Sequence, residues 1–175
     1  MKPENRKNSG RKEKRRVYWV ILGFAAAIAV PVLLLIGSRT KVVGRNIALQ
    51  DITEFVYTAA ASSYPPDYQR YRFYKSEGNH LFYHETRKGT HWPLTENDIT
   101  VSGTVVLTQQ EWSAFLQCLQ GGTVEKVTEN TESGDSGPWL YLYWNEERYS
   151  YSFASYSERI AFEALCAELA AGKDK

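Results

Sequence analysis

Trp139-Leu-Tyr-Leu-Tyr-Trp144 and Arg148-Tyr-Ser-Tyr-Ser-Phe153, joined by Asn-Glu-Glu, are the two alternating runs that decide the fold. Side chains on a strand point alternately to its two faces, so the runs predict a β-hairpin with one apolar face and one mixed face. A shift of the pairing by two residues would leave both faces unchanged. The expected cross-strand pairs are Trp144 with Tyr149, Leu142 with Tyr151 and Leu140 with Phe153.

The apolar face of this hairpin is the expected core. The other face carries Trp139, Tyr141 and Tyr143 beside Ser150 and Ser152. We predict that these three aromatic residues form a ligand-binding platform, because aromatic side chains line many binding sites. The alternative is that they are ordinary strand formers on a solvated sheet, since tyrosine also favours strands.

Outward from the hairpin, the rest of the sequence reads as further strands and two helices. The predicted strands are rich in β-branched and aromatic residues and are bounded by turn residues. Thr108-Gln-Gln-Glu111 and Ser155-Tyr-Ser-Glu158 are the expected helix starts. This order predicts an α+β domain with a mostly antiparallel sheet and two helices covering one face. The expected strands are 52–61, 70–75, 80–86, 100–107 and 123–127, with the two hairpin strands at 138–144 and 148–155. The apolar stripe of the first helix is Trp112, Phe115, Leu116 and Leu119, and that of the second is Phe162, Leu165, Cys166 and Leu169.

Charge divides the chain of 175 residues into three parts. Residues 1–16 hold eight of the 21 basic residues and two of the 20 acidic ones, and residues 17–37 hold none of either. Residues 38–175 therefore carry the other 13 basic and 18 acidic side chains, a net charge of −5. A simple soluble enzyme does not have this distribution.

The uncharged run at 17–37 is long enough to cross a bilayer once as a single transmembrane helix. The basic residues before it predict that the tail at 1–16 is cytoplasmic and that the following residues lie outside the cell membrane. A cleaved signal peptide and a buried core helix are the alternatives. We expect a juxtamembrane linker at 38–50, an extracytoplasmic α+β domain at 51–172 and a short C-terminal tail at 173–175.

Gly134-Asp-Ser-Gly137 resembles the start of the motif around the nucleophile of trypsin-like serine proteases. The resemblance covers only a few residues, and two positions depart from the family. Pro138 stands where the family has a second glycine, and Ala61 stands where it has the catalytic histidine. A serine without a base is not an activated nucleophile, so we predict no protease activity and read this segment as a turn.

The histidines do not predict a metal site. His80 and His84 lie four residues apart on one expected strand, which separates them by roughly 13 Å, too far to share one ion. No phosphate-binding loop or paired-cysteine motif is present in the sequence. We therefore expect no metal, no cofactor and no catalytic residue.

The two cysteines, Cys118 and Cys166, fall one in each expected helix. Outside the cytoplasm such a pair can oxidise, so a disulfide between them is one prediction. The alternative is two small buried thiols, because a free cysteine packs as a small apolar residue.

Together these features predict a membrane-anchored extracytoplasmic module that binds a protein or another envelope component without catalytic activity. Its partners would be the lipid bilayer, through residues 17–37, and that external component. Nucleic acid is not expected, because residues 1–16 contain no aromatic residue on which a base could stack. The alternative is an envelope enzyme that pairs a carboxylate such as Asp135 or Glu85 with a histidine.

Overall fold

The computed structural model describes residues 40–127 and 137–172. The predicted basic tail at 1–16, the predicted membrane span at 17–37 and the predicted C-terminal tail at 173–175 lie outside the described residues. Neither α-helix in the described part of the chain has both the length and the hydropathy that a membrane span needs. The described residues belong to the compact unit that begins at Thr40.

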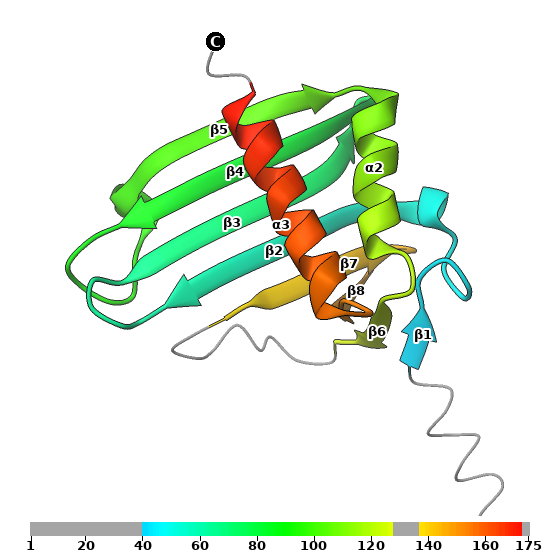
Figure 1. Ribbon diagram of the computed structural model, residues 1–175, viewed down its shortest axis with the longest axis horizontal. Helices are drawn as coiled ribbons and strands as arrows, with labels where there is room; N and C mark the ends of the chain where they lie inside the picture. The colour runs from blue at the N-terminus through cyan, green and yellow to red at the C-terminus, as the bar shows by residue number, and fades with distance from the viewer. Residues whose placement is uncertain (1–39, 128–136, 173–175) are drawn as a thin grey trace, which may run out of the picture. The chain divides into compact units, whose positions relative to one another are not determined.

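Eight strands form one antiparallel sheet in the order β1-β6-β8-β7-β2-β3-β4-β5 (Figure 1). Strands β2 to β5 follow one another as neighbours, whereas β7 pairs with β2 in the middle of the sheet. This arrangement confirms the predicted α+β class. The strands are β1 (Thr40–Val42), β2 (Ile52–Ala61), β3 (Asp67–Ser76), β4 (Asn79–Lys88), β5 (Ile99–Leu107), β6 (Thr123–Lys126), β7 (Trp139–Trp144) and β8 (Glu147–Ser152).

The first strand lies inside the stretch that we expected to be a linker. β1 pairs with β6, and the short 3-10 helix η1 (Leu49–Asp51) leads into β2. Val43 and Ile47, between these elements, are among the most buried side chains of the domain. The domain therefore begins at Thr40 rather than at residue 51, because apolar residues of the expected linker complete its core.

Two helices cover one face of the sheet, α2 (Gln109–Leu119) and α3 (Tyr156–Ala171), as Figure 1 shows. Both begin where the sequence predicts. Thr108 and Glu111 exchange the two hydrogen bonds of a capping box, and Ser155 accepts a hydrogen bond from the backbone N–H of Glu158 at 3.2 Å. Each cap satisfies backbone groups that the first turn leaves unpaired. The helices bury the predicted stripes except that Leu165 is only half-buried.

Aromatic side chains fill the space between the helices and the sheet. Phe55 and Phe73 come from the middle strands, and Phe115 and Phe162 come from α2 and α3; all four are fully buried. The rings of Phe73 and Phe115 are parallel, with centroids 3.9 Å apart, and the ring of Phe162 meets that of Phe55 edge-on at 5.4 Å. These contacts join both helices to the centre of the sheet.

The β7–β8 hairpin has the predicted faces but a different register. Leu142 pairs with Tyr149, and Trp144 pairs with Glu147, so the strands are shifted by two residues from the expected pairing. The cause is the turn, because only Asn145 and Glu146 connect the strands and both have positive φ angles, 50° and 61°. This backbone conformation is that of a two-residue hairpin turn, and it matches the twist of the strands.

Several tyrosines should ionise only at a higher pH than a free tyrosine does, and their ionisation should destabilise the domain. Burial, with smaller electrostatic effects of Cys166 and Glu163, raises the pKa of Tyr71 to about 12. Burial and a hydrogen bond to Glu147 raise the pKa of Tyr149 to about 12. A tyrosine in an unfolded chain has a pKa of about 10. The stabilising contribution is therefore complete below pH 10 and is lost as the pH rises from 10 to 12.

An alkaline titration of a fragment of residues 38–175 measures this effect. We expect the tyrosinate absorbance to rise in two groups, with the second group near pH 12 and accompanied by cooperative loss of the circular dichroism signal. A single titration centred on pH 10 with the fold intact would contradict the burial of these phenols.

Candidate functional site

The face of the sheet that the helices do not cover is the candidate site. Strand alternation and the observed register place many side chains there, and we call fourteen of them, from β2, β3, β4, β7 and β8, the arginine–tyrosine face. Its members are Trp139, Tyr141 and Tyr143 of β7, Glu54, Val56 and Thr58 of β2, Tyr68, Arg70, Arg72 and Tyr74 of β3, Tyr83, Glu85 and Arg87 of β4, and Arg148 of β8.

The basic residues of this face are all arginines. It holds four of the six arginines among the described residues, whereas the four described lysines lie elsewhere: Lys41, Lys75, Lys88 and Lys126. A planar guanidinium stacks on aromatic rings and binds carboxylates through two parallel hydrogen bonds, which an ammonium group does not do. This composition is therefore more typical of a surface that recognises a ligand than of a surface that only keeps a protein soluble.

Three of the four guanidinium groups stack on tyrosine rings. The central carbon of Arg72 lies 4.3 Å from the ring centroid of Tyr74, and that of Arg87 lies 4.4 Å from the ring of Tyr68. Arg148, in the neighbouring hairpin, lies 4.7 Å from the ring centroid of Tyr141. Each stack holds a charged group in a fixed position on the sheet.

Two ion pairs occupy the carboxylates of Glu54 and Glu85. Arg72 binds Glu54 through two hydrogen bonds of 2.7 and 3.1 Å. Arg87 donates two hydrogen bonds, of 2.6 and 2.9 Å, to one oxygen of Glu85. The Glu54 pair is partly exposed, and the Glu85 pair is nearly buried.

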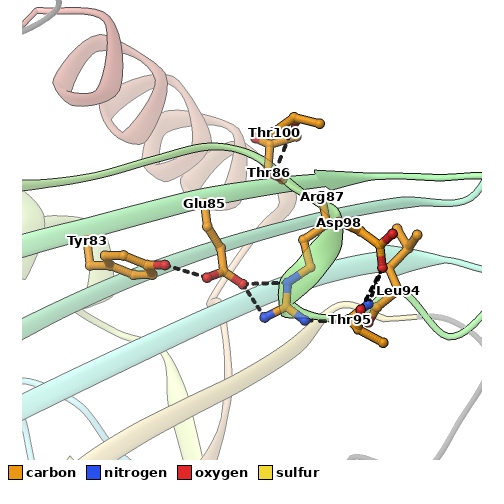
Figure 2. A network of polar contacts seen from close by, with 8 residues as sticks. All are labelled: Tyr83, Glu85, Thr86, Arg87, Leu94, Thr95, Asp98 and Thr100. Carbon is orange, nitrogen blue, oxygen red and sulfur yellow. Dashed lines mark hydrogen bonds and ion pairs between the residues drawn. The ribbon is translucent and has the colours of Figure 1, made fainter.

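The buried pair belongs to a larger network, which Figure 2 shows. The hydroxyl of Tyr83 donates to the second oxygen of Glu85 at 2.5 Å, and burial and this bond raise the pKa of Tyr83 to about 12. Arg87 also donates to the backbone oxygen of Leu94 at 3.4 Å. The network thereby joins β4 to the loop before β5.

Arg70 differs from the other arginines of the face. It lies between Thr58 on β2 and Glu85 on β4 in the register of the sheet. Its Nε atom is buried and has no hydrogen-bond partner among the described residues. Glu85, the carboxylate directly across from it, is instead bonded to Arg87 and Tyr83. A buried donor without an acceptor costs free energy, so such a group in a native protein needs an explanation.

The three aromatic residues predicted from the sequence all lie on this face, but they are not equally accessible. Trp139 and Tyr143 are half-buried, while Tyr141 is only 3% exposed. Tyr141 lies between Val56 and Ser150 and under the guanidinium of Arg148, which cover its ring. Tyr141 therefore offers almost no exposed surface to a ligand, unlike the other two. Whether Trp139, Tyr141 and Tyr143 form a ligand-binding platform stays a prediction.

The residues considered for an enzyme do not converge in the described structure. His80 and His84 point to the helix-covered face, where their rings stack on Trp112 and Phe82, respectively. Glu85 points to the opposite face and is held by its ion pair. Asp135 lies outside the described residues, and the described ones contain no cluster of potential metal ligands.

One carboxylate and one histidine do lie close together, in the loop before β5. His91 and Asp98 are 3.4 Å apart between Nε2 and Oδ2. The same oxygen of Asp98 already accepts hydrogen bonds from the backbone and the hydroxyl of Thr95. These bonds and the proximity of His91 lower the pKa of Asp98. Thr95 and Asp98 form the capping box of the 3-10 helix η2 (Glu96–Asp98), so this carboxylate is engaged in holding the loop.

Both cysteines are free thiols in the structure, Cys166 fully buried and Cys118 half-buried. Burial is the largest cause that raises the pKa of each, and the electrostatic influence of Cys118 on Cys166 adds to it. The structure thus does not contain the disulfide that the sequence allows. Both thiols are protonated at neutral pH and pack as small apolar groups.

Three hollows lined by described residues lie outside the arginine–tyrosine face. One of about 460 Å³ lies between α2 and α3, and one of about 340 Å³ lies beside the start of α3. The third, of about 240 Å³, lies under the C-terminal end of α3 and is lined by Tyr71 and His84. None is lined by an arginine of the face, so the arginines of the face do not form the wall of one of these hollows.

Comparisons with family models, with curated proteins and with solved structures found no match to this chain.

Proposed function

We propose that this protein is a membrane-anchored extracytoplasmic binding module without catalytic activity, and that it binds an external protein through the arginine–tyrosine face. The anchor and the orientation rest on the uncharged run at 17–37 and on the basic tail before it. The proposed part of the chain that binds is the sheet, because both described helices lie on its other side.

The observation that carries this proposal is the composition of the uncovered face. Six aromatic residues and four arginines lie there without a covering helix among the described residues. Tyrosine, tryptophan and arginine are the residues that contribute most to the affinity of protein interfaces, whereas lysine is depleted in them. The absence of lysine from the face agrees with this pattern.

A membrane-impermeant crosslinker applied to intact cells tests both the topology and the binding face. We expect the wild-type chain to be crosslinked to a discrete partner, and Tyr143→Ala to reduce the yield by about tenfold, because truncation of an aromatic anchor typically costs 2 kcal/mol or more. Tyr156→Ala is the matched control, since Tyr156 is 70% exposed on α3 and lies away from the face. Its crosslinking yield should equal that of the wild type.

Two results would contradict the proposal. A chain that reacts only after the cells are opened would overturn the topology. Equal crosslinking yields of the wild type, Tyr143→Ala and Trp139→Ala would show that the partner does not bind to this face.

A further inference from the structure

We infer that two copies of this chain pair through the outer edge of β5, in antiparallel orientation, so that their sheets join into one. The pairing is centred on Gly103, and it places Val101 opposite Val105 and Ser102 opposite Thr104 of the second copy. This inference goes beyond the proposed function and does not depend on it, because it concerns a different part of the domain.

The first argument is the state of this edge of the sheet. β5 is the last strand and pairs only with β4 among the described residues (Figure 1). An exposed edge strand can add a strand from another chain, and proteins often prevent this with very short edge strands, lysine or proline. At the other edge, β1 has only three residues and includes Lys41. β5 has nine residues and contains neither a charged residue nor a proline.

The second argument is the symmetry of the strand. Val101-Ser-Gly-Thr-Val105 reads almost the same in both directions, so a twofold axis at Gly103 opposes valine to valine and hydroxyl to hydroxyl. Opposed hydroxyl residues can share hydrogen bonds, and uncharged residues avoid the repulsion that identical charged strands would suffer. The pairing of this segment with β4 is continuous, since the one register shift lies before Val101. Val106 already makes another interaction and lies outside the inferred pairing.

The third argument is the apolar surface that the edge leaves in a single chain. Val101 and Val105 share the helix-covered side of the strand, yet Val105 is 4% exposed and Val101 is 51% exposed. The α3 residues that line the hollow beside Val101 are three alanines, Ala167, Ala170 and Ala171. A second copy would lay its Val105 beside Val101 and so extend the core across the junction of the two sheets.

The charged groups next to this edge favour a neutral strand as the occupant. Glu85 of β4 lies directly across from Ser102, and its carboxylate is 2.6 Å from the guanidinium of Arg87. His84 lies across from Gly103 and covers it, because a Cβ on this glycine would be 2.7 Å from Nε2 of the ring. The charges of Glu85 and Arg87 thus offset each other, so the edge offers little attraction to a charged peptide. The other β4 residues opposite 101–105 are uncharged: Phe82, Tyr83 and Thr86.

Disulfide crosslinking of the full chain in isolated membranes tests the pairing. Two versions with different tags are expressed together, one with Ser102→Cys and the other with Thr104→Cys, and copper–phenanthroline with oxygen is the oxidant. Directly opposed residues have Cβ atoms about 4.5–5.5 Å apart, near the separation that a disulfide needs. We expect at least tenfold more product with both tags than from Ser102→Cys combined with Ser113→Cys, an exposed control on α2. Cys118 and Cys166 are present in every version, and the parent chain measures their background.

The same experiment also tests the position of the axis. Residues 102 of the two copies would be diagonal neighbours, about 7–8 Å apart. Two tagged versions that both carry Ser102→Cys should therefore crosslink more slowly than the mixed pair.

Val101→Lys tests the pairing without a crosslink. In a single chain, a lysine at this half-exposed position can extend its ammonium group into water, whereas in the pair it would lie against Val105 of the second copy. We expect at least tenfold less co-capture of two tagged versions from gently solubilised membranes. Ser113→Lys adds the same charge on α2 and should leave co-capture within twofold of the wild type. A cooperative thermal transition of Val101→Lys would show that the variant is folded.

The inference is overturned if the mixed cysteine pair crosslinks no faster than the α2 control, whether or not Val101→Lys folds. It is also overturned if folded Val101→Lys is co-captured as well as the wild type, because the copies would then associate through another part of the chain. Faster crosslinking of Ser102→Cys to itself would exclude the axis at Gly103, and a different protein as the main product of Ser102→Cys would exclude a second copy as the occupant. The proposed function would survive each of these results as long as Tyr143→Ala still loses its crosslinked partner on intact cells.

Discussion

Phe73→Ala should lower the free energy of unfolding of the domain by about 3–5 kcal/mol, the range expected for truncation of a fully buried phenylalanine. The side chain has no exposed surface and contacts aromatic rings from both layers of the domain. Its centroid lies 3.9 Å from that of Phe115 on α2 and 4.7 Å from that of Phe82 on β4. Alanine would leave a cavity where the helices meet the sheet. Urea unfolding of a fragment of residues 38–175 measures the change.

Tyr64→Ala provides the matched control for an aromatic truncation. Tyr64 is 80% exposed in the turn between β2 and β3, so its loss should change the free energy of unfolding by less than about 0.5 kcal/mol. Equal effects of the two substitutions would mean that the core does not lie between the helices and the sheet.

Glu85→Ala should lower the free energy of unfolding by about 3–5 kcal/mol, because it leaves a buried cation without its partner. The side chains of Glu85 and Arg87 are only 5% and 12% exposed. Tyr83 would also lose the acceptor of its hydroxyl. The same urea titration measures this loss, and the pKa of Tyr83 should fall toward its usual value.

Two further variants test whether the cost of Glu85→Ala comes from the buried charge that it leaves unpaired. Glu85→Leu combined with Arg87→Met removes both charges and should be considerably less destabilising than Glu85→Ala alone. Glu54→Ala breaks the other ion pair of the face, whose side chains are 22% and 40% exposed, and should cost only about 0–1 kcal/mol. A large effect of Glu54→Ala with none of Glu85→Ala would contradict the observed burial.

Much of the fold follows from local patterns. The helix caps at Thr108 and Ser155 depend on residues three positions apart, and such short-range signals survive in the tertiary structure. The two faces of the β7–β8 hairpin were predictable for a similar reason, since alternation assigns a side chain to a face whatever the register.

Long-range features of the fold were not predictable in this way. β1 has only three residues, and its partner β6 lies more than eighty positions along the chain, so no local pattern indicates the pair. The hairpin register depends on the positive φ angles of Asn145 and Glu146, and glutamate rarely adopts such a conformation.

The candidate site was predictable in part. Trp139 and Tyr143 were assigned to the correct face, but the burial of Tyr141 depends on Arg148 and on Val56 of another strand. The alternation of Arg70 and Arg72 along β3 is itself a period-two signal, and it could have placed both arginines on one face. It could not show that β3 lies two strands away from β7, which is what joins these residues into one surface.

The central position of β2 has a consequence for the order in which the domain is made. β2 pairs with β3, which follows it directly, and with β7, which is synthesised some eighty residues later. Until the chain has grown past Trp144, one edge of β2 has no partner strand, and until α3 is complete Phe55 lacks the ring of Phe162. Pairings between distant residues form slowly, and the segments that await them expose apolar surface meanwhile. The first four long strands must therefore be kept from associating with other chains until the C-terminal third of the protein has emerged.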